Sequence, residues 1–379
     1  MKIAHVCPLC TPAICGVKQV VEELAKRQLK KGHEVHVYCS DWDKEKRQRI
    51  KEEIINGIHI HRCYHWFRVA NFATVWPSIL WKLQKENFDI IHTHVSGHAH
   101  TFFASFIAKT KHIPLVHTTH CPWTDAHRSF TGRMLMWISY RTFTKLSFQW
   151  SNKIIAITPW ELSYIQKYGG KKDKIIIIPN GTDALFYAPI KRNTFKKRHN
   201  IQGKMILFFG RLNVTKGPDK FVLAAKEILK ERKDCTFVMI GPDEGMKAII
   251  EKMIQDTTQI KLLPPLRNRK EVAEMYQAAD CFVLPSFREG LPLTLFEAQA
   301  SGLPIVASPV NGIPYEMKDP DNGFFVDYGD IPKLKEKILK ILDDKKLAQK
   351  ISENNKKKSK NYDWDVIENR YLEAYQEGM

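Results

Sequence analysis

Short apolar runs alternate with amphipathic helical stretches along most of the chain, and this alternation restricts the possible folds more than any other feature. In the first half, the runs expected as strands are Lys2–Val6, Glu34–Cys39, Ile58–Cys63, Asp89–His92, Leu115–Thr118, Lys153–Ile157 and Lys174–Ile178. Between the first two, apolar residues recur at i, i+3, i+4 and i+7 from Val17, which predicts a helix. Gly32 stands where a residue with left-handed backbone ends such a helix. A strand, a helix and a strand at this spacing form a βαβ unit, and strands that are apolar on both faces indicate a parallel sheet.

A second series of apolar runs follows a polar, basic stretch at residues 191–203. Its expected strands are Met205–Phe209, Thr236–Ile240, Ile260–Leu263, Cys281–Leu284, Pro304–Ala307 and Gly323–Val326. A chain of 379 residues is long enough for two or three domains. We therefore predict an α/β protein with two doubly wound domains, residues 1–182 and 183–362. Residues 363–379 are predicted to form a final amphipathic helix that could pack on either domain.

Two basic side chains follow the first strand of the second series. Ligands of parallel α/β sheets bind beyond the carboxyl ends of the strands, so residues in this position are candidates for a site. Arg211 and Lys216 lie five residues apart in a segment bounded by Gly210 and Gly217. Two fixed cations at the end of a strand suit a diphosphate. The alternative is a turn with two solvated basic residues.

Two glutamates follow the strand Cys281–Leu284. Glu289 lies in a loop with Gly290, and Glu297 lies one turn into a helix that is expected to begin near Leu293. The free N–H groups at that helix start can bind an anion, and carboxylates accept hydrogen bonds from hydroxyl groups. A pair that binds a ribose and a sugar, with a diphosphate between them, fits this arrangement. The alternative is one surface glutamate and one glutamate stabilised by the helix dipole.

The first half of the chain carries 14 of the 15 histidines. His94, His98 and His120 follow two neighbouring predicted strands. They could form a metal cluster, but neither zinc spacing nor an accompanying carboxylate supports one. Hydrogen bonding to a polyhydroxyl ligand or a phosphate suits them better. Gly16, directly before the first helix, would let that helix's N-terminus approach a phosphate.

Positive charge is concentrated in the same half. The chain has 59 Lys and Arg against 41 Asp and Glu, a net charge of +18, of which +13 falls in residues 1–182. Residues 123–150 combine aromatic and basic side chains and contain one acid, Asp125; they are Trp123, Phe130, Trp137, Tyr140, Phe143, Phe148 and Trp150 with Arg128, Arg133, Arg141 and Lys145. This pattern suits an anionic bilayer surface, and it suits an ordinary pair of helices with buried aromatic residues at least as well. Nucleic acid would also suit the charge, but no recognised nucleic-acid-binding motif accompanies it.

The eight cysteines are too sparse for a disulfide scaffold. Cys7 and Cys10 form a C-x-x-C pair for which loop packing is a better interpretation than zinc or redox chemistry. Thiols inside apolar runs are expected to pack as small hydrophobic groups; these are Cys39, Cys63, Cys235 and Cys281. No apolar run approaches the ~18–20 residues needed to cross a bilayer, and the first residues resemble a buried strand more than a signal peptide. A reducing cytosol is the expected location.

Several of these segments together resemble the retaining glycosyltransferases of family 4, which have the GT-B fold of two Rossmann-like domains. The segments are Gly210–Leu212 with Lys216 and Gly217, the E-x7-E of Glu289 and Glu297 within residues 285–298, residues 300–308, the hinge-like Ile178–Asp183 with Phe186, residues 241–245, and residues 322–325. The resemblance covers essentially the whole chain and is densest in the second half. Two positions depart from the family pattern: Cys15 precedes Gly16 where many members have two glycines, and Pro264-Pro265 stand where glycine is usual.

The resemblance implies a role for each matching residue. Arg211 and Lys216 would hold the donor diphosphate and neutralise charge on the departing nucleotide. Glu289 would bind the transferred sugar and Glu297 the ribose, while His120 would lie next to the sugar. The remaining donor contacts implied by the resemblance are Gly16, Leu266 and the backbone of Gly290, Leu291, Pro292 and Leu293.

The expected activity is therefore retaining transfer of a hexose from a nucleoside-diphosphate sugar to a lipid-linked or membrane-surface glycan. A UDP-sugar is the first expectation for the donor and GDP-mannose the second, with no metal ion or other cofactor and no nucleic-acid partner. The enzyme is expected in the cytoplasm, peripherally bound to the inner face of the membrane. The alternatives are an epimerase or phosphorylase of the same fold and a non-catalytic nucleic-acid-binding protein. The first two lack the E-x7-E context, and no site for pyridoxal phosphate is evident.

Overall fold

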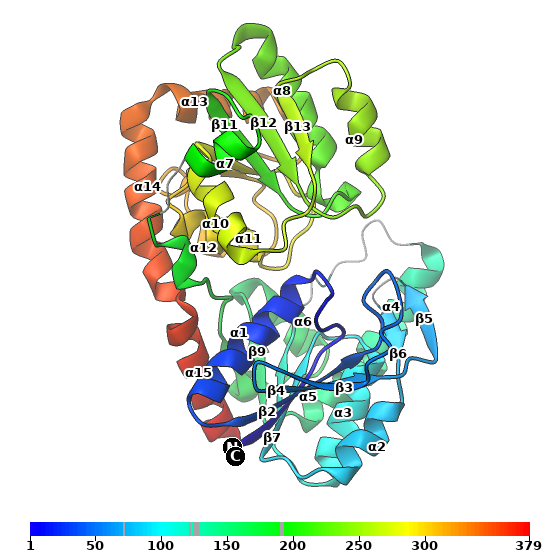
Figure 1. Ribbon diagram of the computed structural model, residues 1–379. Coiled ribbons are helices and arrows are strands. Elements are labelled where there is room, and N and C mark those ends of the chain that lie inside the picture. The colour runs from blue at the N-terminus through cyan, green and yellow to red at the C-terminus, as the bar shows by residue number, and fades with distance from the viewer. Residues whose placement is uncertain (71–72, 121–122, 124–128, 190–192) are drawn as a thin grey trace. The chain divides into compact units, whose positions relative to one another are not determined.

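The computed structural model describes residues 1–70, 73–120, 123, 129–189 and 193–379. The chain divides into two compact units (Figure 1). Unit 1 comprises Met1–Asn180 with Trp364–Met379, and unit 2 comprises Gly181–Asp363. Each unit has its own parallel sheet with helices packed on it, as expected for a chain that alternates buried strands with amphipathic helices.

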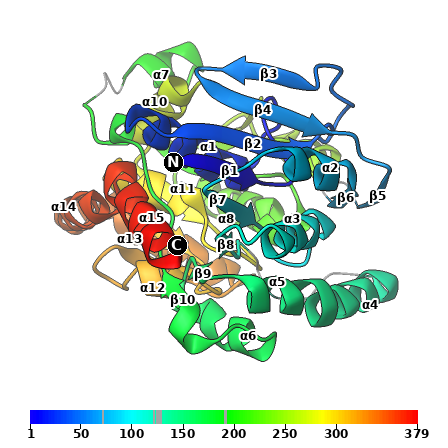
Figure 2. The ribbon, with the colours of Figure 1, turned by 90° about the horizontal axis from the view of Figure 1, so that it is seen from below.

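Unit 1 contains an eight-stranded sheet in the order β10-β9-β8-β7-β1-β2-β4-β3. The strands are β1 (Lys2–Val6), β2 (Glu34–Ser40), β3 (Glu52–Ile55), β4 (Ile58–Cys63), β7 (Ile90–His94), β8 (Leu115–Thr118), β9 (Lys153–Ala156) and β10 (Ile175–Ile177). Neighbouring strands are parallel except for β3, which pairs antiparallel with β4 at one edge (Figure 2). A separate hairpin consists of β5 (Phe67–Ala70) and β6 (Ala73–Val75).

The helices of unit 1 cover both faces of its sheet. They are α1 (Gly16–Lys30), α2 (Ser78–Lys85), α3 (Ala99–Thr110), α4 (Phe130–Ser139), α5 (Lys145–Trp150), α6 (Leu162–Lys167) and α15 (Trp364–Gly378). Helices α2 and α3 share an apolar cluster with Ala4 and Val6 of β1, whereas α1 packs on β2 and β4. The predicted first helix is confirmed, and Gly32 follows its end with a φ of +82°.

The last helix of the chain, α15, belongs to unit 1. It packs against α1, β8 and β9, and its buried side chains include Trp364, Ile367 and Tyr371. Ion pairs link it to α1, because Lys31 contacts Glu368 and Arg27 contacts Asp365. The chain therefore returns to unit 1 after residues 181–363, which form unit 2.

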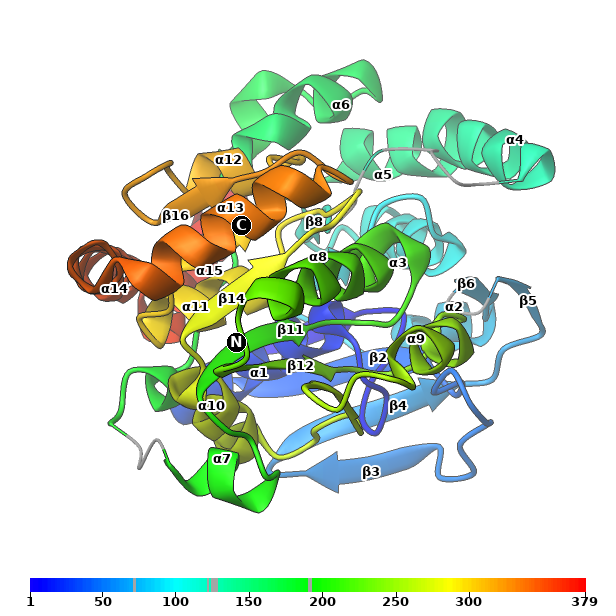
Figure 3. The same ribbon diagram turned by 90° about the horizontal axis from the view of Figure 1, so that it is seen from above.

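Unit 2 contains a six-stranded parallel sheet in the order β13-β12-β11-β14-β15-β16 (Figure 3). The strands are β11 (Lys204–Phe209), β12 (Cys235–Ile240), β13 (Ile260–Leu263), β14 (Cys281–Leu284), β15 (Ile305–Ala307) and β16 (Gly323–Phe325). The helices are α7 (Asn193–Arg198), α8 (Pro218–Glu231), α9 (Lys247–Ile254), α10 (Arg269–Ala278), α11 (Leu293–Ala300), α12 (Ile313–Glu316), α13 (Ile331–Asp343) and α14 (Lys345–Ser359). The strand order reverses between β11 and β14, and such a switch point is where doubly wound sheets bind ligands.

Alternate residues of the central strand β11 belong to two different apolar clusters. Ile206 and Phe208 belong to one cluster, and Met205 and Leu207 belong to the other. Successive side chains of a strand point to opposite faces, so the sheet is buried on both sides. This burial explains why every strand of unit 2 could be predicted from its apolar run.

Three features of unit 1 differ from the sequence analysis or go beyond it. Cys39, expected to pack as a free thiol, forms a disulfide with Cys10, and their Cα atoms are 5.9 Å apart. That prediction is therefore wrong for Cys39, although Cys63 is free and buried as expected. The edge strand β3 and the β5–β6 hairpin were not predicted. In the described part of the chain, no helix is both long and apolar enough to cross a membrane.

Candidate functional site

The loops after β11 and β14 carry three of the predicted site residues, namely Arg211, Lys216 and Glu289. They leave the two strands that flank the switch point of the sheet, so their residues meet at its carboxyl edge. Nζ of Lys216 lies 2.5 Å from Oε2 of Glu289, which links the two loops directly. Two residues that were predicted separately as candidates are thus in contact.

The backbone of the two loops explains why they approach so closely. The carbonyl of Thr215 accepts a hydrogen bond of 2.9 Å from the N–H of Phe287. Gly217 has a φ of +65°, and a Cβ atom at this position would lie 2.1 Å from the carbonyl oxygen of Pro285. Only glycine fits there, because any side chain would collide with backbone.

The Lys216–Glu289 pair is almost completely enclosed, with side chains 13% and 4% exposed. The Ser286 hydroxyl donates to the other Glu289 oxygen at 2.7 Å. Burial lowers the pKa of Lys216, and the adjacent Glu289 carboxylate opposes this effect. An ammonium group has three N–H bonds, so pairing with Glu289 leaves donors for a second anion.

Arg211 has a different partner from Lys216. Its guanidinium lies 2.7 Å from Glu244, which also accepts a hydrogen bond of 2.9 Å from the Asn213 side chain. The Arg211 side chain is 43% exposed. Each of the two predicted diphosphate ligands is therefore balanced by its own carboxylate. Residues 241–245 belong to the segments that resemble the family, but no role was predicted for Glu244.

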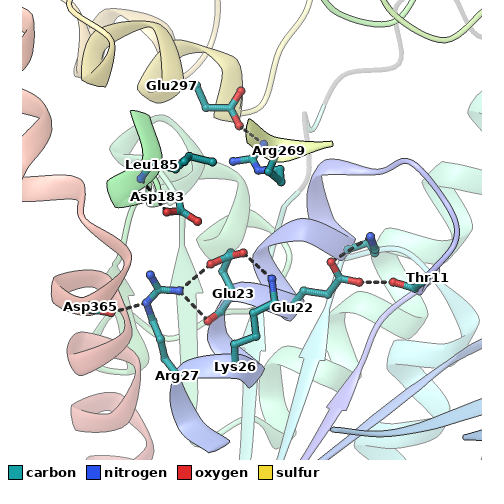
Figure 4. Close-up of polar contacts among 11 residues, drawn as sticks. Thr11, Glu22, Glu23, Lys26, Arg27, Asp183, Leu185, Arg269, Glu297 and Asp365 are labelled. Atoms are coloured by element: carbon teal, nitrogen blue, oxygen red, sulfur yellow. Dashed lines mark hydrogen bonds and ion pairs between the residues drawn. The ribbon is translucent and has the colours of Figure 1, made fainter. Parts of the chain in front are cut away.

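Glu297, in α11, forms a second buried cluster. One of its oxygens lies 2.8 Å from Nη1 of Arg269 (Figure 4). The other accepts a 3.0 Å hydrogen bond from the hydroxyl of Tyr276. Burial, and then the adjacent carboxylate, raise the pKa of Tyr276 well above its ordinary value. Asn268 caps α10 and so fixes the position of Arg269 as its first residue. Neither Arg269 nor Tyr276 was predicted. The one sequence signal for Arg269 was Asn268, a residue type that commonly caps a helix start.

The remaining donor-site candidates of unit 2 lie in loops or at the start of α11. Leu266 is half-buried between β13 and α10 and packs against the apolar cluster on one face of the sheet. Leu291 is buried, and the carbonyl of Gly290 accepts a hydrogen bond from Gly312. Pro292 precedes α11 and Leu293 is its first residue, so the predicted start of this helix is confirmed.

In unit 1, His120 follows β8 and is hydrogen-bonded to His94, with 3.2 Å between Nε2 of His120 and Nδ1 of His94. Burial lowers the pKa of His120 to about 3. His98 lies elsewhere, with its ring 5.3 Å from that of His100. The three-histidine cluster that the sequence suggested is therefore not the one observed.

Within the described residues, the histidines close enough to share a metal ion are His5, His92 and His94. Each of their six ring nitrogens already has a hydrogen-bond partner in the protein. The protein's own hydrogen bonds thus account for this cluster.

The loop that carries His120 is held from both sides by Glu161. One carboxylate oxygen of Glu161 accepts from the Thr119 hydroxyl at 2.7 Å and from the Trp123 indole N–H at 2.9 Å. The other accepts from the backbone N–H of Ile157 at 2.6 Å. Burial raises the pKa of Glu161 to about 7, although these hydrogen bonds act in the opposite direction. Glu161 was not predicted from the sequence, because two of its partners, Thr119 and Trp123, lie far from it in the chain.

Gly16 is the first residue of α1, directly after Cys15, which has an extended backbone. The preceding loop is tied to the helix by a hydrogen bond from Thr11 to Glu22 (Figure 4). Glu22 also pairs with Lys18.

The aromatic and basic stretch at residues 123–150 separates into two parts. Trp123, Tyr140 and Phe148 are buried in an apolar cluster. Helix α4, in contrast, has no buried residue. Its exposed apolar side chains are Phe130, Met134, Leu135, Trp137 and Ile138. Asp125 and Arg128 lie outside the described residues.

Comparison with known families and proteins adds independent information. The family described as "Glycosyltransferase Family 4" matches residues 14–184, and the family described as "Glycosyl transferases group 1" matches residues 190–358. A galactosyltransferase of Escherichia coli, named UDP-Gal:alpha-D-GlcNAc-diphosphoundecaprenol alpha-1,3-galactosyltransferase, is 31% identical over 276 residues, covering 70% of this chain and 69% of the relative. A D-inositol 3-phosphate glycosyltransferase of Corynebacterium diphtheriae is 28% identical over 312 residues, covering 78% of this chain and 72% of the relative.

Solved structures show the same architecture. HepE of Anabaena, solved with UDP and glucose, aligns with a TM-score of 0.79 at 17% identity and covers 99% of each chain. WaaG, a glycosyltransferase involved in lipopolysaccharide biosynthesis, aligns with a TM-score of 0.75 at 18% identity and covers 98% of each chain. These likenesses establish the fold alone.

Proposed function

Because the chain belongs to the group 1 glycosyltransferases of glycosyltransferase family 4, and is thus a glycosyltransferase with the GT-B fold, we propose that it transfers a hexose with retention of configuration. The donor is a UDP-sugar, with GDP-mannose as the second candidate. The acceptor is a lipid-linked glycan or a glycan at a membrane surface. The observation that carries the proposal is the buried Lys216–Glu289 pair between the loops that follow β11 and β14.

The donor diphosphate binds at Lys216 and Arg211 in this proposal. Cations fixed in a site from which water is largely excluded stabilise the negative charge that develops on a departing nucleoside diphosphate. Lys216 is enclosed and Arg211 is more exposed, so Lys216 contributes the larger share. No metal ion or other cofactor is needed, because these two side chains supply the positive charge.

The two glutamates bind hydroxyl groups. Glu289 accepts hydrogen bonds from the transferred sugar, and Glu297 accepts them from the ribose, where Arg269 and Tyr276 hold its carboxylate in place. Leu266, Gly16 and the backbone of residues 290–293 complete the donor site, and His120 lies against the sugar. These roles are proposals that follow from the family membership and from the positions of the residues at strand ends.

Retention follows from attack on the same face as the departing group. The bond between the anomeric carbon and the phosphate oxygen breaks, and the acceptor oxygen forms its bond to that carbon on the same side. The proton of the acceptor hydroxyl passes to the departing phosphate oxygen. Positive charge at Lys216 and Arg211 favours this step, because the phosphate gains negative charge as the bond breaks.

The acceptor proposal rests on helix α4 and on the charge of the first half. Five apolar side chains of α4 are exposed, the largest fractions being 74% for Phe130 and 56% for Trp137. Arg141 lies over the Trp137 ring, 4.4 Å from its centroid. An exposed apolar helix with basic neighbours suits an anionic membrane surface, so the enzyme is proposed to bind peripherally to the cytoplasmic face of the membrane. The name of the E. coli relative specifies an undecaprenol-linked acceptor, which supports the same class for this chain.

A thermal-shift panel of UDP, GDP, ADP and TDP tests the donor proposal. A nucleotide present at roughly 100 times its Kd stabilises the protein by about 2.7 kcal/mol. We expect UDP to raise the Tm most and GDP to come second. Equal, small shifts with all four nucleotides would contradict a nucleoside-diphosphate donor.

A further inference from the structure

A row of buried side chains in unit 1 connects helix α1 to His120. Gln28 of α1 contacts His5 of β1, His5 contacts His94 of β7, and His94 contacts His120 after β8. The distances are 2.8 Å from Gln28 Oε1 to His5 Nε2, 3.1 Å from His5 Nδ1 to His94 Nε2, and 3.2 Å from His94 Nδ1 to His120 Nε2. Neighbouring strands bring these rings together, because β1 pairs in register with β7 and β7 pairs with β8.

All three histidines of this row are neutral near pH 7. His5 and His94 are fully buried, and burial lowers the pKa of each below its ordinary value, to about 4 for His5. The pKa of His120 is lowered by the same cause. A neutral imidazole carries one N–H donor and one bare acceptor nitrogen, so each ring must donate at one end and accept at the other.

The direction of the row is set at Gln28. Its Oε1 can only accept, so His5 donates from Nε2 and accepts at Nδ1. The other end of the amide supports this orientation, because Gln28 Nε2 lies 3.4 Å from the hydroxyl oxygen of Tyr375, which in turn lies 2.6 Å from Nδ1 of His92. His94 must therefore donate from Nε2 to His5 and accept at Nδ1 from His120.

We propose that this hydrogen-bonded chain of Gln28, His5 and His94 sets the tautomer of His120. The chain holds the proton of His120 on Nε2 and leaves Nδ1 bare. His120 then meets the donor sugar only as a hydrogen-bond acceptor, so it selects a sugar hydroxyl that donates a hydrogen bond. In the described part of the chain, Nδ1 of His120 has no recorded hydrogen-bond partner, which leaves it available for this contact.

Gln28, His5 and His94 are positioning residues in this scheme, because they act on the substrate only through His120. The inference rests on the proposed function, since it is the proposed function that places His120 against the sugar. The backbone of His120 has a φ of +44°, a strained conformation for a residue with a side chain, and its ring is held by His94.

The tautomer of His120 can be measured without any assay of transfer. Long-range 1H–15N correlation spectra of the full chain, labelled with 15N-histidine, distinguish the Nε2–H and Nδ1–H forms, and His120→Gln identifies the signals of His120 by their absence. We expect the Nε2–H form in the unaltered protein. The Nδ1–H form at His120 would overturn the proposal.

Variants at Gln28 test the control of the tautomer. Gln28→Met removes the acceptor for His5 and should produce a mixture of both forms at His120, whereas Gln28→Glu retains an acceptor oxygen and should preserve Nε2–H. His117→Gln is the matched control, because His117 is equally buried and is hydrogen-bonded to Thr93 and Ser96, outside the row. A Gln28→Met protein with an unchanged tautomer would contradict the proposal, as would a His117→Gln protein with the same mixture. Zinc bound stoichiometrically to the purified protein would contradict it too, since the metal would occupy the ring nitrogens.

Activity provides the second readout. With the UDP-hexose that the unaltered protein transfers as donor, Gln28→Met should lower kcat/KM about tenfold, and Gln28→Glu should recover most of the loss. If activity falls while the tautomer of His120 is unchanged, the role of Gln28 is merely structural and the proposal fails. If no nucleotide stabilises the protein, the proposed function fails instead, and the spectra still report whether the row sets the tautomer.

Discussion

Lys216 and Glu289 form a buried ion pair, so the loss of Lys216 is expected to affect both the stability of the protein and its catalysis. Breaking a buried ion pair by removing one partner costs about 3–5 kcal/mol, because the remaining charge is left without compensation. We therefore expect Lys216→Met to lower the free energy of unfolding by roughly that amount. We also expect it to lower the rate of sugar transfer by about 10²–10³-fold, through loss of the charge at the departing phosphate. Urea unfolding and a transfer assay measure the two effects.

The double variant Lys216→Met with Glu289→Gln distinguishes the two contributions. It removes both charges and should regain most of the stability while remaining inactive. Lys220→Met is the control, because Lys220 lies in the following helix and pairs with the half-buried Asp219. A Lys216→Met enzyme with full activity would show that the donor site has been placed wrongly.

Glu161 gives the protein a pH dependence of a definite sign. Its pKa is about 7 in the folded chain, against an ordinary value of 4.5. Between these values the folded chain binds more protons than the unfolded chain, so the contribution of Glu161 is complete below pH 4.5 and is lost as the pH rises through 7. The difference corresponds to about 3 kcal/mol. The free energy of unfolding, measured in urea from pH 5 to pH 8, should therefore fall more steeply in the unaltered protein than in Glu161→Gln. Equal slopes would show that Glu161 is ionised throughout.

At the level of single elements, helix α15 provides a matched pair of positions. Ile367 is completely buried against unit 1, whereas its neighbour Val366 is 46% exposed. Removal of a buried isoleucine side chain beyond Cβ costs about 2–5 kcal/mol, and a change at an exposed position changes stability by about 0.5 kcal/mol or less. We expect Ile367→Ala to lower the free energy of unfolding by the larger amount and Val366→Ala to change it little. Similar effects of both changes would contradict the packing of α15 on unit 1.

The elements that could be predicted from the sequence are those buried on two faces. Each strand of the unit 2 sheet is a mostly apolar run, and its observed bounds differ from the predicted ones by no more than one residue at either end. Strand β3 escaped prediction because it lies at an edge of its sheet and leaves Ile54 66% exposed, so its apolar pattern is weak. The β5–β6 hairpin was not predicted for a similar reason: it is short, and its apolar residues Phe67 and Val69 are exposed rather than buried.

The candidate site could be predicted only in part, for a related reason. Position after a strand identifies Arg211, Lys216 and Glu289, because the chain itself brings these residues to the edge of the sheet. Their partners cannot be found this way. Glu244 lies in the loop after β12 and Arg269 is the first residue of α10, so only the packed structure shows that they pair with Arg211 and Glu297.

At the scale of the whole molecule, the charge of +18 needs an explanation that the donor site does not provide. Residues 183–379 carry a net charge of only +5, and one enclosed lysine and one arginine suffice for a diphosphate. The remaining +13 lies in residues 1–182, the part that contains α4. Attraction between exposed charges and acidic lipid is screened by salt, whereas contacts with an enclosed ammonium group are screened much less.

We therefore expect binding to vesicles and binding to the donor nucleotide to respond differently to salt. Co-sedimentation with vesicles that contain phosphatidylglycerol should be strong at 0.05 M NaCl, where the Debye length is roughly 14 Å. It should be weak at 0.5 M NaCl, where the Debye length is about 4 Å. Vesicles of phosphatidylcholine alone should bind little at either concentration. The Tm increase caused by UDP should change far less over the same range.

The variant Phe130→Ser with Trp137→Ser links this behaviour to α4. Both side chains are exposed, so the free energy of unfolding should change by about 0.5 kcal/mol or less, whereas co-sedimentation should fall because the apolar contact with the bilayer is lost. Ile249→Ser is the control, because Ile249 is 51% exposed on α9 of unit 2. Equal binding by both variants would show that α4 does not contact the membrane. Equal binding to neutral and acidic vesicles would show that the positive charge serves another partner, and a gel-shift assay at low salt would then test nucleic acid directly.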